Sequence, residues 1–392
     1  MATSGLMTTY KPMSVTFEKG DGVWLYDTEG KQYLDCITGI AVCGLGHCHP
    51  RVTQTIQDQA QRLVHTSNLY RIRYQEELGA RLAEISNMEA CFFGNSGAEA
   101  NECAIKIARL YGHNKGIEKP AIVVADQSFH GRTLATLSAT GNRKVQAGFE
   151  PLVQGFVRSP YNDLDAIRTI AANNTNVVAV MVEPVQGEGG INIPADDYLS
   201  GLRQICDDNG WLLILDEIQT GNGRTGTYFN YQQHGILPDV VTTAKGLGNG
   251  LPIGACLARG EAANTLKPGN HGSTYGGNPL CCATALTVVN TLVEENLPQR
   301  AAELGRRIVD NLKTQLESVA MVREVRGKGL MIGIELTQAC SPLVALAKDR
   351  GLLINVTAEK VIRLLPALTM SDEESDNMVN LLSQLIKEYA AQ

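Results

Sequence analysis

The sequence predicts an α/β fold, in which a large, doubly wound and mostly parallel sheet is accompanied by a smaller α+β domain. Strand and helix signals alternate through the middle of the chain, as in successive βα units. Two of the strands, at 211–216 and 238–244, are continuous apolar or β-branched runs, typical of parallel strands covered on both faces. With 392 residues, the chain is also too long for one ordinary core.

The N-terminal part is predicted to contain short strands and turns between residues 15 and 43. The segment 22–35 indicates a hairpin, because Thr-Glu-Gly stands at its centre. Pro50 is suited to the first turn of a helix, which we expect to reach about residue 64. A helix should also begin at Gly97, after the first strand of the large sheet. Strands of this sheet are expected at 90–93, 121–125, 177–182, 211–216 and 238–244.

The C-terminal part is predicted to leave the sheet through two helices between 280 and 316, separated at the Leu-Pro-Gln of 297–299. Strands should follow at 322–336 and 361–365, with an amphipathic helix at 372–389. We therefore expect three parts. They are an N-terminal segment that joins the small domain (1–50), a large domain (51–309) and a C-terminal small domain (310–392).

The composition argues against several classes of function. Hydrophobic residues make up 44% and charged residues 19%, as in ordinary globular proteins. No apolar run reaches the ~18 residues needed to span a bilayer, and a net charge of −7 disfavours nucleic acid as a partner. The first residues lack the basic flank and apolar core of a signal peptide, and the ten cysteines are irregularly spaced. We expect a cytoplasmic protein with reduced thiols and neither a membrane nor a nucleic-acid partner.

Asp216 and Lys245 stand at the carboxyl ends of two neighbouring apolar strands, where ligands bind in such sheets. Pyridoxal phosphate needs a lysine for its Schiff base and an acid that keeps its pyridine nitrogen protonated. These two residues would supply both groups. Taken singly, however, an Asp at a strand end is often a helix cap, and a Lys before glycine is usually a loop residue.

Two further segments could bind the phosphate of such a cofactor. Ser96, Gly97 and Ala98 lie between a strand and a helix, where small residues let backbone amides approach an anion. The adjacent hydroxyls of Ser273 and Thr274 occupy a turn-rich loop. Because such turns are common, each segment alone is a weak indication.

Three more side chains suit the ring or a substrate. Phe129 could stack on a pyridine ring, and Arg132 offers a two-pronged contact for a carboxylate. Glu188, among flexible glycines, could point into the same site. A core Phe, a surface Arg and a solvated Glu would look the same in the sequence. The run 47–49 (His-Cys-His) is not interpreted as a metal site, because neighbouring side chains of an extended segment point to opposite sides.

Together, six motifs in matching order resemble the class-III, pyridoxal-phosphate-dependent aminotransferases, from about Gly22 to Leu368. Within the class, the chain most resembles the acetylornithine aminotransferases of arginine biosynthesis. The resemblance implies a fold-type I enzyme that acts as a homodimer with active sites at the interface. It also implies ping-pong transfer of the terminal amino group of N2-acetylornithine to 2-oxoglutarate. The motifs lie at 96–101, 129–133, 183–188, 215–226, 244–250 and 272–279.

The resemblance also implies roles for residues that contact the cofactor. Lys245 would bind the aldehyde of pyridoxal phosphate and shuttle a proton, and Asp216 would pair with the pyridinium nitrogen. Gln219 would bind the phenolic oxygen, and Phe129 would stack on the ring. Contacts to the phosphate would come from Ser96, Gly97 and Ala98, two of them through backbone amides, and from Thr274 of the neighbouring subunit.

The substrates would be held by a second group of residues. Arg132 would bind the α-carboxylate of acetylornithine, with Ser273 also near the substrate. Arg363 would bind the α-carboxylate of glutamate or 2-oxoglutarate. Glu188 would neutralise Arg363 while the amine donor is bound and release it for the dicarboxylate.

Several alternatives stay open. Succinylornithine, succinyldiaminopimelate and 4-aminobutyrate suit the same carboxylate clamp. Ornithine is disfavoured, because ornithine aminotransferases place a tyrosine in the segment that here reads Thr-Gly-Ile-Ala-Val (38–42). An aminomutase of the same class would not need Arg363. A transcription regulator that binds the cofactor would need a DNA-binding segment, and a catalytically silent protein would be expected to lose Lys245 or Asp216.

Overall fold

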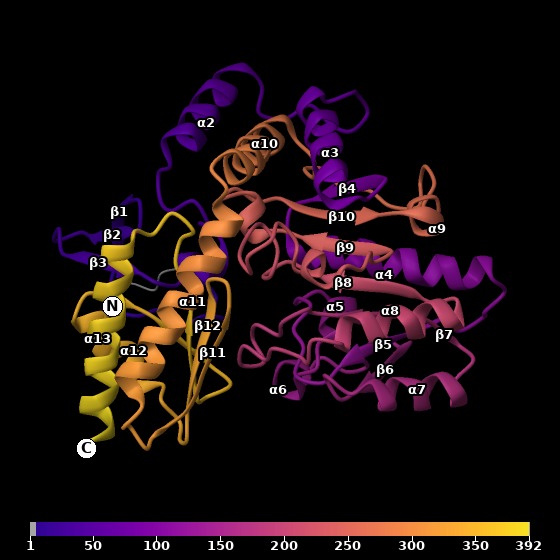
Figure 1. Cartoon of the computed structure of the whole chain (residues 1–392). Coiled ribbons are helices and arrows are strands. Elements are labelled where there is room, and N and C mark those ends of the chain that lie inside the picture. Colours follow the sequence, from indigo (N-terminus) through magenta and orange to yellow (C-terminus); the bar gives the residue numbers. More distant parts are fainter. Residues whose placement is uncertain (1–4, 392) are drawn as a thin grey trace.

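The computed structural model describes residues 5–391, and the largest of its sheets has seven strands (Figure 1). Strands β9, β8, β7, β5 and β6 pair in parallel, whereas β10 is antiparallel to both β9 and β4. This arrangement confirms the predicted, mostly parallel sheet. In spatial order the strands are β4 (Ala90–Gly94), β10 (Gly254–Ala258), β9 (Val240–Thr243), β8 (Leu212–Asp216), β7 (Val177–Val182), β5 (Ala121–Ala125) and β6 (Phe156–Ser159).

Helices cover both faces of this sheet, which explains the continuous apolar runs. Leu212 and Ile214 of β8 share a buried cluster with residues of α4 (Gly97–Asn114). Leu213 and Leu215 belong to a second cluster, with residues of α8 (Tyr198–Asn209). Because successive strand residues point to opposite faces, every residue of β8 has to be compatible with burial.

Two smaller sheets lie beside the large one. The first joins the N-terminal hairpin to the C-terminal part, because β13 pairs in parallel with β3. Its order is β1 (Phe17–Asp21), β2 (Trp24–Asp27), β3 (Gln32–Asp35) and β13 (Leu352–Leu353). The second is antiparallel throughout, in the order β11 (Val322–Lys328), β12 (Met331–Leu336), β15 (Val361–Leu364) and β14 (Asn355–Thr357).

The predicted helices are present. Two helices are present here, but the break lies at 295–296, because α10 ends at Glu294 and α11 begins at Leu297. The segment 297–299, where the break was predicted, instead forms the first turn of α11, since a proline is tolerated there. No helix in residues 5–391 is long and apolar enough to cross a membrane. The remaining helices are α1 (Thr38–Ala41), α2 (Pro50–Arg62), α3 (Arg73–Ser86), α5 (Leu134–Ala139), α6 (Arg143–Gln146), α7 (Leu164–Asn173), α9 (Gly260–Ala263), α10 (Pro279–Glu294), α11 (Leu297–Leu316), α12 (Pro342–Asp349) and α13 (Asp372–Ala390), with short 3-10 turns η1 (Asn230–His234) and η2 (Lys245–Leu247).

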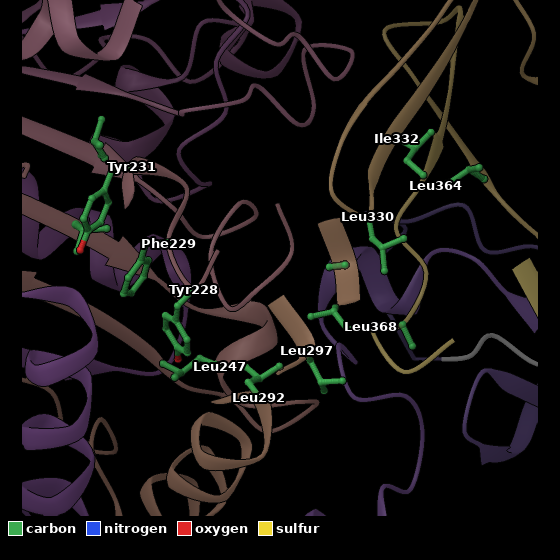
Figure 2. Close-up of a cluster of buried hydrophobic side chains, with 14 of the residues drawn as sticks. Tyr228, Phe229, Tyr231, Leu247, Leu292, Leu297, Leu330, Ile332, Leu364 and Leu368 are labelled. Carbon is green, nitrogen blue, oxygen red and sulfur yellow. The ribbon is translucent and has the colours of Figure 1, made fainter. Parts of the chain in front are cut away.

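One buried cluster connects the large sheet with the C-terminal sheet. It contains Leu213 of β8 together with Ile332 of β12 and Leu364 of β15. Part of this cluster is drawn in Figure 2, where Leu292 and Leu297 lie between Leu247 and Leu368. The shared core fixes β15 relative to the strand ends of the large sheet. The predicted domain boundaries at residues 50 and 309 remain a prediction, and residues 1–4 and 392 lie outside the described part of the chain.

Several strands and helices were not predicted individually. Strand β10 reads Gly-Ala-Cys-Leu-Ala, and small residues have low strand propensity, so its conformation depends on pairing with β4 and β9. Strand β6 is short and lies at the edge of the sheet. Helix α12 and the short strands β13 and β14 of the C-terminal part were also missed.

Candidate active site

Most of the predicted site residues line one cavity of about 430 Å³ at the carboxyl ends of the large sheet's parallel strands. Arg363 lies behind its wall, and Ser273 and Thr274 lie outside it. The predicted residues that line the cavity are Ser96, Gly97, Ala98, Phe129, Arg132, Glu188, Asp216, Gln219 and Lys245.

Lys245 begins the turn η2 that follows β9, and it reaches the cavity with a left-handed backbone, φ 46°. Burial lowers the pKa of the Lys245 amine, and the charge of Arg363 adds to this effect. Nearby acids, of which Glu188 acts most strongly, oppose the shift without reversing it. A lowered pKa favours the neutral amine, which is the nucleophilic and basic form.

Asp216 ends β8, and its carboxylate is held in a fixed orientation. Asn101 Nδ2 donates to its Oδ2 at 2.8 Å, and His130 Nδ1 pairs with the same oxygen at 2.7 Å. The backbone N–H of Ile218 donates to Oδ1 at 3.1 Å. All three side chains of this network are buried. The carboxylate is therefore pre-oriented at the bottom of the cavity.

Asn101 and His130 were not predicted as site residues. Each belongs to a motif that was recognised, 96–101 or 129–133, but contacts between a helix, a loop and a strand end cannot be seen in the sequence. His130 Nε2 has no hydrogen-bond partner in residues 5–391.

Glu183 follows β7 and lies buried at the cavity wall. Its two oxygens accept hydrogen bonds from the N–H groups of Phe129, at 2.9 Å, and Gly187, at 3.1 Å. Burial raises the pKa of Glu183 to about 7, and the charge of Asp216 acts in the same direction, whereas His130 and the two amides oppose the shift. Glu183 therefore connects the loops that carry Phe129 and Glu188.

Replacing Glu183 by glutamine is expected to weaken the pH dependence of stability. Folding raises the pKa of Glu183 from about 4.5 to about 7, so its contribution to stability is present below the lower value and is lost as the pH rises through the higher one. From about pH 5 to about pH 8, the wild type should lose on the order of 3 kcal/mol of stability relative to Glu183→Gln. Urea unfolding of both proteins across this range measures the difference, and parallel pH curves would contradict it.

The start of α4 forms an anion-binding end of the cavity. Ser96 is the N-cap, and its Oγ accepts from the N–H of Glu99 at 3.2 Å. The N–H groups of Gly97 and Ala98, in the first turn, have no intrahelical acceptor and can bind a phosphate. A Cβ at position 97 would lie 2.7 Å from Ile218 Cδ1, so any larger residue at this point would have to displace the Ile218 side chain.

These features fit pyridoxal phosphate. The helix start suits the phosphate, Phe129 offers a ring face at the cavity wall, and the Asp216 carboxylate provides the acidic partner for a ring nitrogen. The Lys245 amine enters the same cavity. The assignment of each contact to an individual residue remains a prediction.

Arg132 lies exposed at the edge of the cavity. Its guanidinium carbon is 5.5 Å from the centre of the Phe129 ring. This cation–π contact orients the arginine next to the ring that would stack on the cofactor. Its N–H groups remain accessible to a carboxylate from solvent.

Arg363, by contrast, is fully buried on β15. Its Nη1 forms an ion pair with Glu188 Oε1 at 2.5 Å and donates to Gln219 Oε1 at 3.3 Å. Glu188 and Gln219 line the cavity and separate Arg363 from it. Burial disfavours the charged form of Glu188, but Arg363, together with Lys245 and Gln219, outweighs this effect and the pKa of Glu188 is lowered. The predicted pairing of Glu188 with Arg363 is thus present in the structure.

Ser273 and Thr274 do not join these residues within one chain. Ser273 Oγ contacts the N–H of Gly276 at 2.9 Å and Asn95 Nδ2 at 3.2 Å, and Thr274 is exposed. Their expected contacts would be made with a second subunit, so those roles remain predictions.

The left-handed turn α1 leads into Val42, a residue of the cavity wall that was not predicted. Its four residues, Thr38 to Ala41, have φ values between 50° and 67°, which is a left-handed turn. Such a conformation is unfavourable for Ile40, a β-branched residue, and strain of this kind is concentrated at functional sites. Val42, which follows this turn, lines the cavity together with 250–253.

Comparisons with known proteins agree with this geometry. The family model "Aminotransferase class-III" matches residues 6–386. Acetylornithine aminotransferase from Nitrosomonas europaea is 56% identical over 383 residues, which cover 98% of each chain. Among solved structures, ornithine aminotransferase from Toxoplasma gondii has a TM-score of 0.95 at 34% identity, covering 98% of this chain and 93% of that one. Acetylornithine aminotransferase from Elizabethkingia anophelis has a TM-score of 0.89 at 33% identity, covering 97% and 96%.

The family model spans nearly the whole chain, and the relative from Nitrosomonas europaea matches this chain over nearly its full length. Both the fold and the enzyme class predicted from the sequence are confirmed. The chain belongs to the class-III aminotransferases, which are enzymes that depend on pyridoxal phosphate.

Proposed function

We propose that this enzyme transfers the terminal amino group of N2-acetylornithine to 2-oxoglutarate, in arginine biosynthesis. The products are N-acetylglutamate 5-semialdehyde and glutamate. One observation carries the proposal: of two arginines near the cavity, Arg132 is exposed and Arg363 is covered by Glu188. A donor with one carboxylate needs only Arg132, whereas a dicarboxylate can also engage Arg363. The relative from Nitrosomonas europaea, at 56% identity, supports this choice of donor.

When bound, pyridoxal phosphate supplies an aldehyde that takes up the amino group and a protonated ring that accepts an electron pair. Asp216, oriented by Asn101 and His130, holds the proton on the ring nitrogen. Lys245 Nζ, with its lowered pKa, removes a proton from the carbon that carries the amino group and later returns one. Phe129 would stack on the cofactor ring, and the helix start of α4 would bind the phosphate.

Arg132 would orient the donor by its α-carboxylate, so that its far amino group points to the Lys245 end of the cavity. During this half of the cycle Glu188 keeps Arg363 neutralised. A dicarboxylate can then compete for Arg363 once the Glu188 side chain moves away. Because the two substrates use the cavity in turn, we expect ping-pong kinetics.

Other donors of the same class remain alternatives. The similarity to an ornithine aminotransferase, with a TM-score of 0.95, does not favour ornithine, because fold similarity alone does not determine substrate. The segment 38–42 contains no tyrosine, unlike the ornithine-specific subgroup. Succinylornithine, succinyldiaminopimelate and 4-aminobutyrate would satisfy Arg132 equally well.

We further propose a cytoplasmic homodimer in which Ser273 and Thr274 reach the partner's cavity. The exposure of Thr274 and its position outside the cavity of its own chain support such a contact. All ten cysteines are free, in agreement with a reducing compartment.

A panel of amino donors tests the proposed function. Purified enzyme with pyridoxal phosphate and 2-oxoglutarate is given acetylornithine, succinylornithine, ornithine, 4-aminobutyrate or lysine, and glutamate formation is followed. We expect acetylornithine to lead in kcat/KM by about an order of magnitude or more. A leading 4-aminobutyrate or ornithine would overturn the proposed donor but keep the reaction class. No glutamate from any donor would instead favour an aminomutase.

A further inference from the structure

Strand β14 contacts both members of the Arg363–Glu188 pair. Asn355 lies directly opposite Arg363 in the antiparallel register, and its Oδ1 accepts a hydrogen bond from Arg363 Nε at 3.0 Å. Two residues further along β14, Thr357 Oγ1 donates to the backbone carbonyl of Glu188. The same strand thus holds the arginine side chain and the backbone of the acid that neutralises it.

The contact with Asn355 determines which edge of the guanidinium remains for a ligand. Nε is occupied by Asn355, and Nη1 by Glu188 and Gln219. Nη2 is buried and has no hydrogen-bond partner in residues 5–391. A buried N–H without a partner is costly, so its presence indicates a group that arrives later. When the Glu188 side chain leaves, Nη1 and Nη2 form a free fork that matches the two oxygens of a carboxylate.

The amide at position 355 also preserves the charge of Arg363. Glu188 is the one carboxylate at ion-pair distance from Arg363 in residues 5–391. Asn355 accepts a hydrogen bond but carries no charge, so the arginine becomes a free cation when the Glu188 side chain moves. The anchor from Thr357 fixes the backbone of Glu188, which confines that movement to the side chain. A carboxylate at 355 would instead be a permanent counterion.

We propose that Asn355 is a positioning residue for the second substrate: it orients Arg363 and keeps it cationic, and so makes the site selective for a dicarboxylate. This inference rests on the proposed function, in which Arg363 serves only the 2-oxoglutarate half of the cycle. Asn355 does not line the cavity and acts through Arg363.

The test compares Asn355→Asp and Asn355→Ala with the wild-type holoenzyme. In a ping-pong reaction, each substrate's kcat/KM reports its own half of the cycle. For Asn355→Asp we expect kcat/KM for 2-oxoglutarate to fall roughly tenfold or more, while kcat/KM for the amine donor stays within about threefold. Asn355→Ala, which removes the acceptor without adding charge, should show a smaller but similarly selective loss. Asn377→Asp, an exposed change on α13, is the matched control and should leave both values unchanged.

A binding measurement separates this inference from the proposed function. Glutarate, a dicarboxylate that cannot react, is titrated into each holoenzyme by calorimetry. Its Kd should rise roughly tenfold in Asn355→Asp, whichever amine is the true donor. An unchanged glutarate Kd, or equal losses in both kcat/KM values, would overturn the role of Asn355. Failure of every donor in the wild type would overturn the proposed function while leaving the glutarate result valid.

Discussion

Lys245→Ala is expected to abolish turnover, with a loss of about four orders of magnitude or more in kcat. Lys245 is the one lysine that lines the cavity in residues 5–391, and its lowered pKa gives it a neutral amine at a pH where an exposed lysine is charged. Without that amine, no second lysine among the cavity-lining residues can take over as the proton carrier between donor and cofactor. Glutamate formation from acetylornithine and 2-oxoglutarate measures the effect.

The control for this prediction is Lys313→Ala, which removes an exposed lysine of α11. It should retain wild-type kinetics. The cofactor's absorbance would show whether Lys245→Ala still holds pyridoxal phosphate through the helix start of α4 and Asp216. Multiple turnovers near the wild-type rate would show that Lys245 is not the proton carrier.

Asp216→Asn is expected to lower kcat by about a thousandfold. The substitution keeps the size of the side chain and one oxygen that can accept from Asn101 and His130. It removes the negative charge, which is what holds a proton on the ring nitrogen and makes the ring an electron acceptor. The loss should therefore appear in kcat for every donor, with little change in overall stability.

Asp21→Asn, an exposed change at the end of β1, is the matched control and should not affect the rate. Rates are compared after saturation with pyridoxal phosphate, so that weaker cofactor binding is not mistaken for slower chemistry. If Asp216→Asn retains a tenth or more of the wild-type kcat, Asp216 does not control the protonation of the ring.

Local sequence patterns predicted the framework and the centre of the site. The residues of strands β8 and β9 that precede Asp216 and Lys245 are apolar or β-branched, because both strands are buried on both faces. Parallel strands end at the same edge of a sheet, so two polar residues at their ends were expected to face one cavity, and they do. Ser96 and the small residues after it identified the start of α4 for the same local reason.

Contacts between segments that are distant in the sequence could not be predicted from these patterns. His130 and Asn101 look like ordinary loop and helix residues until the fold brings both to Asp216. Strand β10 has small residues with weak strand propensity and is fixed by its neighbours in the sheet. Asn355 gave no signal, because its importance depends on the register of β14 against β15.

By itself, the sequence determined the mostly parallel sheet, the positions of Asp216 and Lys245 at its strand ends and, through its motifs, the enzyme class. These features depend on the local alternation of apolar runs, glycines and helix starts. Only the tertiary structure decided that Arg363 is buried behind Glu188 and held by Asn355. That arrangement arises because a shared hydrophobic core fixes the C-terminal sheet against the large one, which no local pattern in the sequence encodes.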